Sequence, residues 1–197
     1  MSLRLGDAAS RPGRWPGHAA VVWGLAFAVP SFAWAWGVGL TTASTALAPP
    51  LVELARERDP GFIALLWATG ALKAVGGLLG VALVCRRAWG RGTNRLLQLA
   101  GWGATVLLVW HGAEFVVHGL LVQAHVIDID PDLSSVTRWY TYLWGPWFVA
   151  GGVLFGLAAR THLSAVADRA DAVIAGRVGG FGALALSAAA ALASRLG

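Results

Sequence analysis

Five long apolar runs constrain this sequence more than any other feature. They cover residues 19–40, 62–85, 96–124, 139–159 and 172–193. At 1.5 Å per residue, a helix of about 20 residues crosses a hydrocarbon layer about 30 Å thick. The runs are continuously apolar, whereas the strands of a membrane barrel alternate apolar and polar residues. We therefore predict an all-α integral membrane protein, a helical bundle of five transmembrane helices with a four-helix core plus a fifth helix.

The first and last runs need separate arguments. The first follows two arginines, as a signal peptide would, but its residues 19–40 carry no charge and are too long for a signal core. We expect it to remain as the first span. The last run is mostly Ala and Gly and contains Arg177. We expect the Arg177 side chain to extend from the first turns of this helix to the lipid headgroups.

The composition excludes most other classes of protein. The chain is 57% hydrophobic and 13% charged, whereas soluble domains carry about a quarter charged residues. Its net charge of +5 comes from basic residues that border the apolar runs, so we expect no nucleic-acid partner. A single cysteine, Cys85, excludes an intramolecular disulfide and any multi-cysteine metal cluster.

The basic residues also predict an orientation in the cytoplasmic membrane. Nine arginines belong to the N-terminal tail and the second and fourth connections, with Arg177 just beyond the fourth, and four arginines belong to the opposite side. Basic residues favour the cytoplasmic side, so the N-terminus is expected inside and the C-terminus outside. We predict a cytoplasmic tail over residues 1–18, a four-helix membrane domain over residues 19–160, and a cytoplasmic connection with the fifth helix over residues 161–197.

Polar residues cluster inside two of the runs. His111, Glu114, His118 and His125 fall within about 60° of one face of the third helix, at 100° per residue. A charged group facing lipid at the bilayer centre costs about 2.5–3.5 kcal/mol, so this face should point into the bundle. Lys73, the only lysine, lies at the middle of the second run. In an antiparallel pair of helices it reaches nearly the depth of His111.

Four interpretations of this cluster compete. The leading one is a structural ion pair between Lys73 and Glu114 that holds two helices in register. The second is a pocket or catalytic site for a small apolar or lipid-like molecule, with Lys73, His111 and Glu114 as polar anchors and tryptophans as walls. The third is a proton or ion relay along the histidines. The fourth is metal or haem ligation, but His111 and His118 lie about 10 Å apart along a helix, too far for one ion, so no metal site is predicted.

Two prolines predict irregular helices around this cluster. Pro30 should kink the first helix, and the Gly145–Pro146 step should break or bend the fourth helix near its outer end. Both are expected as cavity walls. We predict that Trp144 and Trp147, on either side of this step, form the outer lid of the bundle.

Small residues at four-residue spacing predict close contacts between helices. Gly76 and Gly80 lie on the second run, and Gly152 and Gly156 lie on the fourth. Glycines at this spacing let neighbouring backbones approach closely. We expect both pairs to be packing residues.

Several short motifs resemble one known family. The motifs are VID at 126–128, RW at 138–139, LWGPWF at 143–148, GGVLF at 151–155, AVPSF at 28–32 with Trp34, and Leu72–Lys73 with Gly76. Over roughly residues 19–160 the chain resembles a family of small bacterial multi-spanning membrane proteins known only as a domain of unknown function. The resemblance implies a four-helix architecture and places Lys73 among matched positions, but it implies no activity. Gly145 stands where that family commonly has an acidic residue.

The sequence predicts a multi-spanning membrane protein with a polar intramembrane cluster that binds a small apolar or lipid-like molecule. The residues of that site are Lys73, His111, Glu114, His118, Trp144 and Trp147. The alternative is an accessory or structural subunit of a larger membrane complex, in which the Lys–Glu pair is purely structural. The expected partners are the lipid bilayer, such a ligand, and another membrane protein or a second copy of the chain. The sequence identifies neither a cofactor nor an enzymatic activity, because it contains no catalytic motif.

Overall fold

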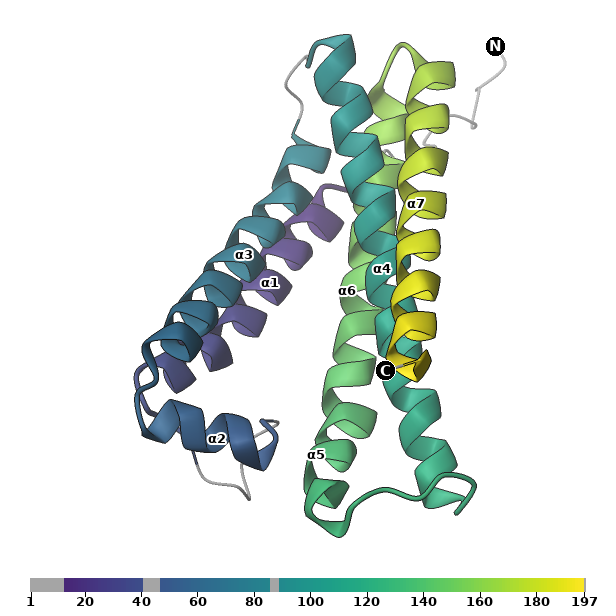
Figure 1. The fold of residues 1–197 in the computed structure, drawn as a ribbon. Helices are drawn as coiled ribbons and strands as arrows, with labels where there is room; N and C mark the ends of the chain where they lie inside the picture. The colour runs from purple at the N-terminus through teal and green to yellow at the C-terminus, as the bar shows by residue number, and fades with distance from the viewer. Residues whose placement is uncertain (1–12, 41–46, 86–88, 197) are drawn as a thin grey trace, which may run out of the picture.

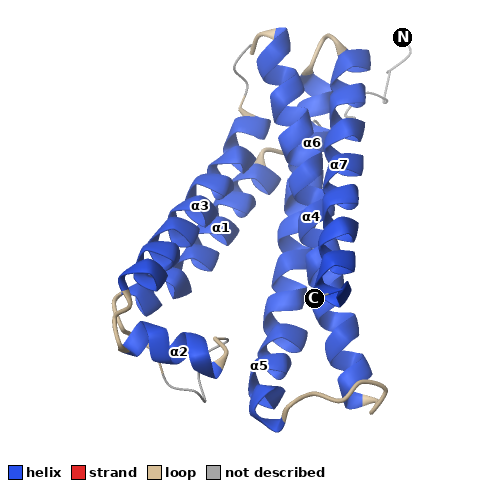
Figure 2. Cartoon of the chain, viewed as in Figure 1, coloured by secondary structure: helices blue, strands red, loops and turns tan. Residues whose placement is uncertain are grey.

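A computed structural model describes residues 13–40, 47–85 and 89–196 of the chain. The described residues are 85% helical, and no strand occurs among them (Figure 2). Five helical segments are long and apolar enough to cross a membrane. They are α1 (Trp15–Ala35), α3 (Pro60–Val84), α4 (Arg91–Gln123), a composite segment over Pro131–Ala165, and α7 (Arg169–Leu196). The predicted all-α fold with five candidate spans, including the fifth, is confirmed.

The first helix is shifted toward the N-terminus relative to the predicted run. It begins at Trp15, with Pro16 in its first turn, where the missing proline N–H breaks no helical hydrogen bond. It ends at Ala35 because a turn follows, in which Gly37 and Gly39 have φ angles of 84° and 74°. Such positive φ angles are incompatible with a continuing right-handed helix. The last five residues of the predicted run, 36–40, are therefore not helical.

The helices form two groups that meet at one end. One group is the pair α1 and α3, and the other is α4 packed against both α6 (Gly145–Ala165) and α7. Figure 1 shows the two groups close together at one end and separating toward the end that carries the short helices α2 (Pro49–Arg56) and α5 (Ser134–Trp139). The backbones of the two groups are therefore farther apart at this end than at the other.

Glycines bring α1 and α3 into close contact. A Cβ atom added at Gly24 would lie 2.8 Å from the Gly77 Cα, and one added at Gly80 would lie 2.7 Å from the Gly17 carbonyl oxygen. Gly80 is thus a packing residue, as predicted. The prediction for Gly76 was wrong, because nothing lies within 4 Å of a Cβ added there. The face of α3 that meets α1 passes through its neighbour Gly77 instead.

The glycines predicted on the fourth span do contact a neighbouring helix. A Cβ atom at Gly152 would lie 2.6 Å from a Val109 methyl, and one at Gly156 would lie 3.2 Å from a Thr105 methyl. Both neighbours belong to α4. This prediction is confirmed, and these contacts explain why α6 follows α4 along much of its length.

A hydrogen bond and one apolar core join the two groups at their closed end, and a buried hydrogen bond ties α4 to α6 within the second group. Trp23 of α1 donates its indole N–H to the Trp147 carbonyl of α6 at 2.8 Å. Gln98 of α4, fully buried, donates to the Ala159 carbonyl of α6 at 2.9 Å. The core around them consists of Ala20, Trp23, Leu83, Val84, Leu97, Phe155, Ala158 and Ala159. Every long helix except α7 contributes to this core, so it fixes the two groups to each other.

A second apolar core closes only the α1–α3 group at its far end. It consists of Ala35, Leu40, Val52, Ala55, Phe62 and Leu66. Two arginines at the end of the amphipathic α2 and just after it add hydrogen bonds here: Arg56 donates to the Leu40 carbonyl at 2.9 Å and Arg58 to the Ala35 carbonyl at 2.6 Å. No residue of the α4–α6–α7 group belongs to this core. The two groups are therefore free to stand apart here.

The fourth span is not broken at Gly145–Pro146, where a break or a bend was predicted, but its helix is irregular just before this step. A 3-10 turn (Pro131–Leu133) leads into α5, a π-helical turn η2 (Tyr140–Trp144) and then α6. The Gly145 N–H bonds to the Tyr140 carbonyl, five residues back. A proline ring normally clashes with the carbonyl four residues before it. The wider π turn accommodates Pro146 at the start of α6 without interrupting the helix.

Candidate functional site: an aromatic cavity between the helix groups

A cavity of about 210 Å³ lies between the two helix groups. Side chains from α1, α3, α4 and the η2–α6 segment line it, so neither group forms it alone. The lining residues are Phe27, Pro30, Trp34, Lys73, His111, Phe115, Tyr140, Trp144 and Phe148. We call this the aromatic cavity. Pro30 is one of its walls, as predicted.

Helical spacing explains why these residues share one cavity. Phe27, Pro30 and Trp34 are three and four residues apart, and side chains at this spacing lie on one helix face. Tyr140, Trp144 and Phe148 also recur every four residues, through η2 into α6. Two aromatic stripes on opposing helix groups therefore face each other across the gap.

Lys73 is the cationic group of the cavity. Its Nζ donates a hydrogen bond to the Ser31 Oγ at 2.9 Å and lies 4.0 Å from the centroid of the Phe27 ring. Ser31 is 1% exposed and belongs to α1, so this bond links the two helices of one group. No carboxylate of the described residues forms an ion pair with Lys73.

The predicted Lys73–Glu114 ion pair is not formed. Leu83 of α3 packs on Gly101 of α4, where an added Cβ would lie 3.1 Å from a leucine methyl. Lys73 comes ten residues before Leu83 on α3, and His111 comes ten residues after Gly101 on α4. Lys73 and His111 are therefore at similar depth, as expected. The helices diverge between the contact and this level (Figure 1). Equal depth therefore does not bring the two charges together.

Most residues of the predicted polar face of α4 lie outside the cavity. Glu114 does not line it, and its side chain is 48% exposed, with the nearest carboxylate oxygen 3.9 Å from His111 Nδ1. His118 is exposed and does not line it either. The expectation for His125 was wrong, because α4 ends at Gln123 and His125 has a φ of 55° in the following turn. Only His111 of this polar face reaches the cavity.

The two predicted lid tryptophans have different positions. Trp144 lines the cavity, with its ring centroid 5.4 Å from that of Phe27. Trp147 instead stacks on Trp23 at 6.2 Å and packs against the closed-end core. The structure thus assigns Trp144 to a cavity wall and Trp147 to the contact that joins the groups.

Sequence reasoning missed Ser31, Phe27, Phe115, Tyr140 and Phe148. Two signals were present in the sequence. Ser31 is a hydroxyl residue directly after a proline within an apolar run, a position where its side chain can serve a neighbouring helix. The aromatic residues have the four-residue spacing of a single helix face. Neither signal identifies the neighbouring helix that this helix face contacts.

The cavity combines one ammonium group, one imidazole and one phenol hydroxyl with aromatic walls. Lys73, His111 and Tyr140 can each donate a hydrogen bond to a bound oxygen atom. The described residues contain no cluster of three His, Cys, Asp or Glu side chains suited to a metal. The arrangement suits an apolar molecule with one hydrogen-bond-accepting group.

Comparison with protein families identifies the part of the chain that forms this cavity. The family model described as "Protein of unknown function (DUF3995)" matches residues 24–155. The chain belongs to this family. The matched region includes every residue that lines the aromatic cavity, whereas α7 lies outside it. No curated protein and no solved structure matches the chain.

Proposed function

We propose that this DUF3995 protein spans the cytoplasmic membrane with five helices, N-terminus inside, and binds a small apolar molecule in the aromatic cavity. The ligand carries one carboxylate or carbonyl oxygen, which accepts a hydrogen bond from Lys73. The observation behind this proposal is the Lys73 ammonium, which lies in an aromatic cavity without a carboxylate partner among the described residues.

The partners of Lys73 within the chain leave part of its bonding capacity unused. An ammonium has three N–H donors, and Ser31 accepts one of them. The Phe27 ring contributes about 0.5–2 kcal/mol as a cation–π contact. A charged lysine at mid-span costs about 2.5–3.5 kcal/mol. A ligand oxygen would supply the remaining hydrogen bonds and, if it is a carboxylate, the missing counter-charge.

The size and the walls of the cavity restrict the ligand. An apolar cavity of about 150 Å³ holds benzene, whereas pockets for drug-sized ligands measure about 300–1,000 Å³. The volume of about 210 Å³ therefore fits one ring, or a polar head with a few methylenes. Edge-to-face packing already joins His111, Phe115 and Phe148, and a planar ligand ring can extend this arrangement. We infer that the ligand is a single-ring molecule with an acidic or carbonyl group.

The alternative of a purely structural subunit receives less support. That interpretation relies on Lys73 and Glu114 neutralising each other between two packed helices. Lys73 instead faces a cavity and bonds to Ser31, while Glu114 is half exposed. A cavity with a free hydrogen-bond donor favours ligand binding.

Mass spectrometry of the intact protein, purified in a mild detergent, tests this proposal. We expect the wild-type chain to retain one small molecule and the Lys73→Met variant to lose it. Glu114→Gln is the matched control, because it removes a charge from the next helix but not from the cavity, and it should retain the molecule. Equal retention by wild-type and Lys73→Met protein would rule out Lys73 as the anchor.

A further inference from the structure

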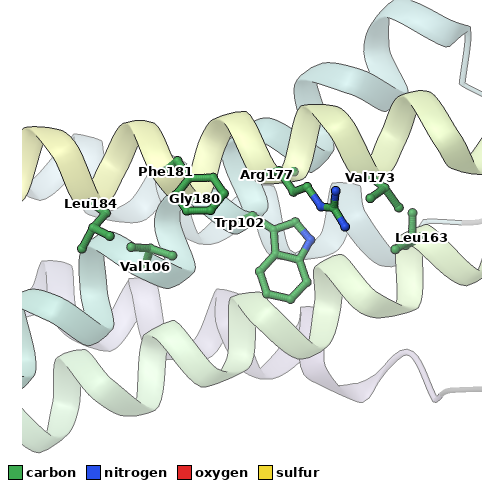
Figure 3. A pocket seen from close by; sticks show the side chains of 9 residues that line it. Trp102, Val106, Leu163, Val173, Arg177, Gly180, Phe181 and Leu184 are labelled. Carbon is green, nitrogen blue, oxygen red and sulfur yellow. The ribbon is translucent and has the colours of Figure 1, made fainter.

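A second hollow lies on the other side of the bundle, between α4, α7 and the end of α6. Its volume is about 380 Å³, and a single charged residue, Arg177, interrupts its apolar lining (Figure 3). The other lining residues are Trp102, Val106, Leu163, Val173, Gly176, Gly180, Phe181 and Leu184. We call it the α4–α7 groove. Phe181 at its rim is 70% exposed, so the groove opens to the surroundings of the helices.

The Arg177 side chain is directed along the groove. Figure 3 shows its guanidinium beside Leu163 and Val173, on the side away from Phe181 and Leu184. Arg177 lies eight residues after the start of α7 at Arg169, or about 12 Å along the helix. The side chain thus extends back toward the helix end, as predicted for a basic residue that reaches for headgroups.

The nearby carboxylates are engaged by other arginines. At the start of α7, Asp171 bonds to Arg95, and Asp168 lies 2.7 Å from the Arg91 Nε. Arg177 has no hydrogen bond or ion pair with any described residue. Its guanidinium therefore retains all five N–H donors for a ligand.

A polar hollow adjoins the groove at the same end of the bundle. That hollow measures about 610 Å³, and Leu163 lines both it and the groove. Arg160, Thr161, Ser164 and Arg169 are among its lining residues. The apolar groove, with Arg177 as its charged residue, thus lies beside a surface with two further arginines and two hydroxyl groups. This combination matches an acyl chain joined to an anionic headgroup.

We propose that the α4–α7 groove binds an anionic phospholipid of the surrounding bilayer. The phosphate accepts hydrogen bonds from Arg177, whose planar guanidinium matches two phosphate oxygens. One acyl chain lies along Trp102, Val106 and Phe181, and the rest of the headgroup faces Arg160 and Arg169. Basic pockets between transmembrane helices recognise anionic headgroups in this way. The site is separate from the aromatic cavity and does not depend on its ligand.

Lipid titration followed by mass spectrometry of the intact, delipidated chain tests the headgroup. The probes are phosphatidylglycerol, which is anionic, and phosphatidylcholine, which is zwitterionic. We expect the wild-type chain to bind phosphatidylglycerol more tightly. Arg177→Gln should weaken that binding about tenfold, since it removes hydrogen bonds between charged groups. Arg138→Gln, which changes an exposed arginine of α5, should leave it unchanged.

Two glycines of α7 provide a matched test of the groove itself. Gly180 lines the groove, and a Cβ added there would lie 3.4 Å from a Val106 methyl, so the side chain of Gly180→Leu would fill the groove. Gly182 has nothing within 4 Å of an added Cβ, so Gly182→Leu is the control. We expect Gly180→Leu, but not Gly182→Leu, to reduce phosphatidylglycerol binding. Equal wild-type binding of the two lipids, or undiminished binding by Arg177→Gln and Gly180→Leu, would overturn the proposal.

Discussion

The contact between α1 and α3 predicts opposite effects for alanine at two glycines. A Cβ atom at Gly24 would lie 2.8 Å from the Gly77 Cα and 2.9 Å from the Lys73 carbonyl oxygen. Ordinary contacts begin at about 3.4 Å, so the two backbones would have to separate by about 0.6 Å. Such overpacking costs about 1–3 kcal/mol, whereas glycine to alanine within a helix gains about 0.5–1 kcal/mol. Gly24→Ala should therefore be destabilising by about 1–2 kcal/mol.

Gly76→Ala is the matched control, because the alanine has the higher helix propensity but its Cβ contacts no neighbouring helix. Nothing lies within 4 Å of a Cβ added at Gly76, so this variant should be stabilised by about 0.5–1 kcal/mol. For a chain of this size, 1 kcal/mol shifts Tm by about 2–4 °C. We expect Gly24→Ala to lower Tm by several degrees and Gly76→Ala to raise it slightly. Thermal unfolding followed by tryptophan fluorescence in one detergent measures both, and a Gly24→Ala protein as stable as Gly76→Ala would refute the packing argument.

Three further predictions concern the buried polar groups and the topology. In double-mutant cycles on thermal stability, the effects of Lys73→Met and Glu114→Gln should be additive, whereas those of Lys73→Met and Ser31→Ala should be coupled. Only Lys73 and Ser31 share a hydrogen bond. Coupling between Lys73 and Glu114 without coupling between Lys73 and Ser31 would contradict the structure. Gln98→Leu should cost about 0.5–1.5 kcal/mol, since it removes the buried hydrogen bond from Gln98 to the Ala159 carbonyl of α6, and an unchanged Tm would be inconsistent with that bond. In cells, a membrane-impermeant thiol reagent should fail to label Cys85 from outside, while a C-terminal reporter should be active only outside; the reverse pattern would invert the proposed orientation.

The number and kind of helices were predictable, and the helix ends were less so. A helix that crosses a bilayer needs an apolar run of about 20 residues, and the sequence alone shows the length of each run. The end of α1 depends instead on the backbone of Gly37 and Gly39, where glycine permits but does not require the positive φ angles observed. The same holds for Pro146, which can break a helix or sit after a π turn, depending on how the preceding residues pack.

The candidate site was predicted in part, for a related reason. Periodicity and run length place Lys73 and His111 at one depth and on inward faces, and the structure has both on one cavity. They do not give the distance between helix axes. The packing of Leu83 on Gly101 fixes that distance at one end, and the two helix groups then diverge. Lys73 consequently meets Ser31 of its own group instead of a carboxylate of α4.

The choice between neighbouring glycines shows the same limit. Gly76 and Gly80 have the four-residue spacing of a packing motif, but the structure uses Gly77 and Gly80. A spacing rule identifies a helix face only to within about one residue, or 100° of rotation. The partner helix α1 decides which face is used, through close contacts at Gly17 and Gly24.

Chemical modification of Lys73 tests the central claim most directly, because it is the only lysine of the chain. Benzaldehyde forms an imine with a free amine and loses water, and cyanoborohydride then reduces the imine to a stable benzylamine. A single ring of this size fits the aromatic cavity of about 210 Å³. Peptide mapping of the folded protein in mild detergent should find Lys73 benzylated, in the wild-type chain and in Glu114→Gln alike. A Lys73 that stays unmodified in the folded protein but reacts after unfolding would contradict an accessible cavity with this lysine as its anchor.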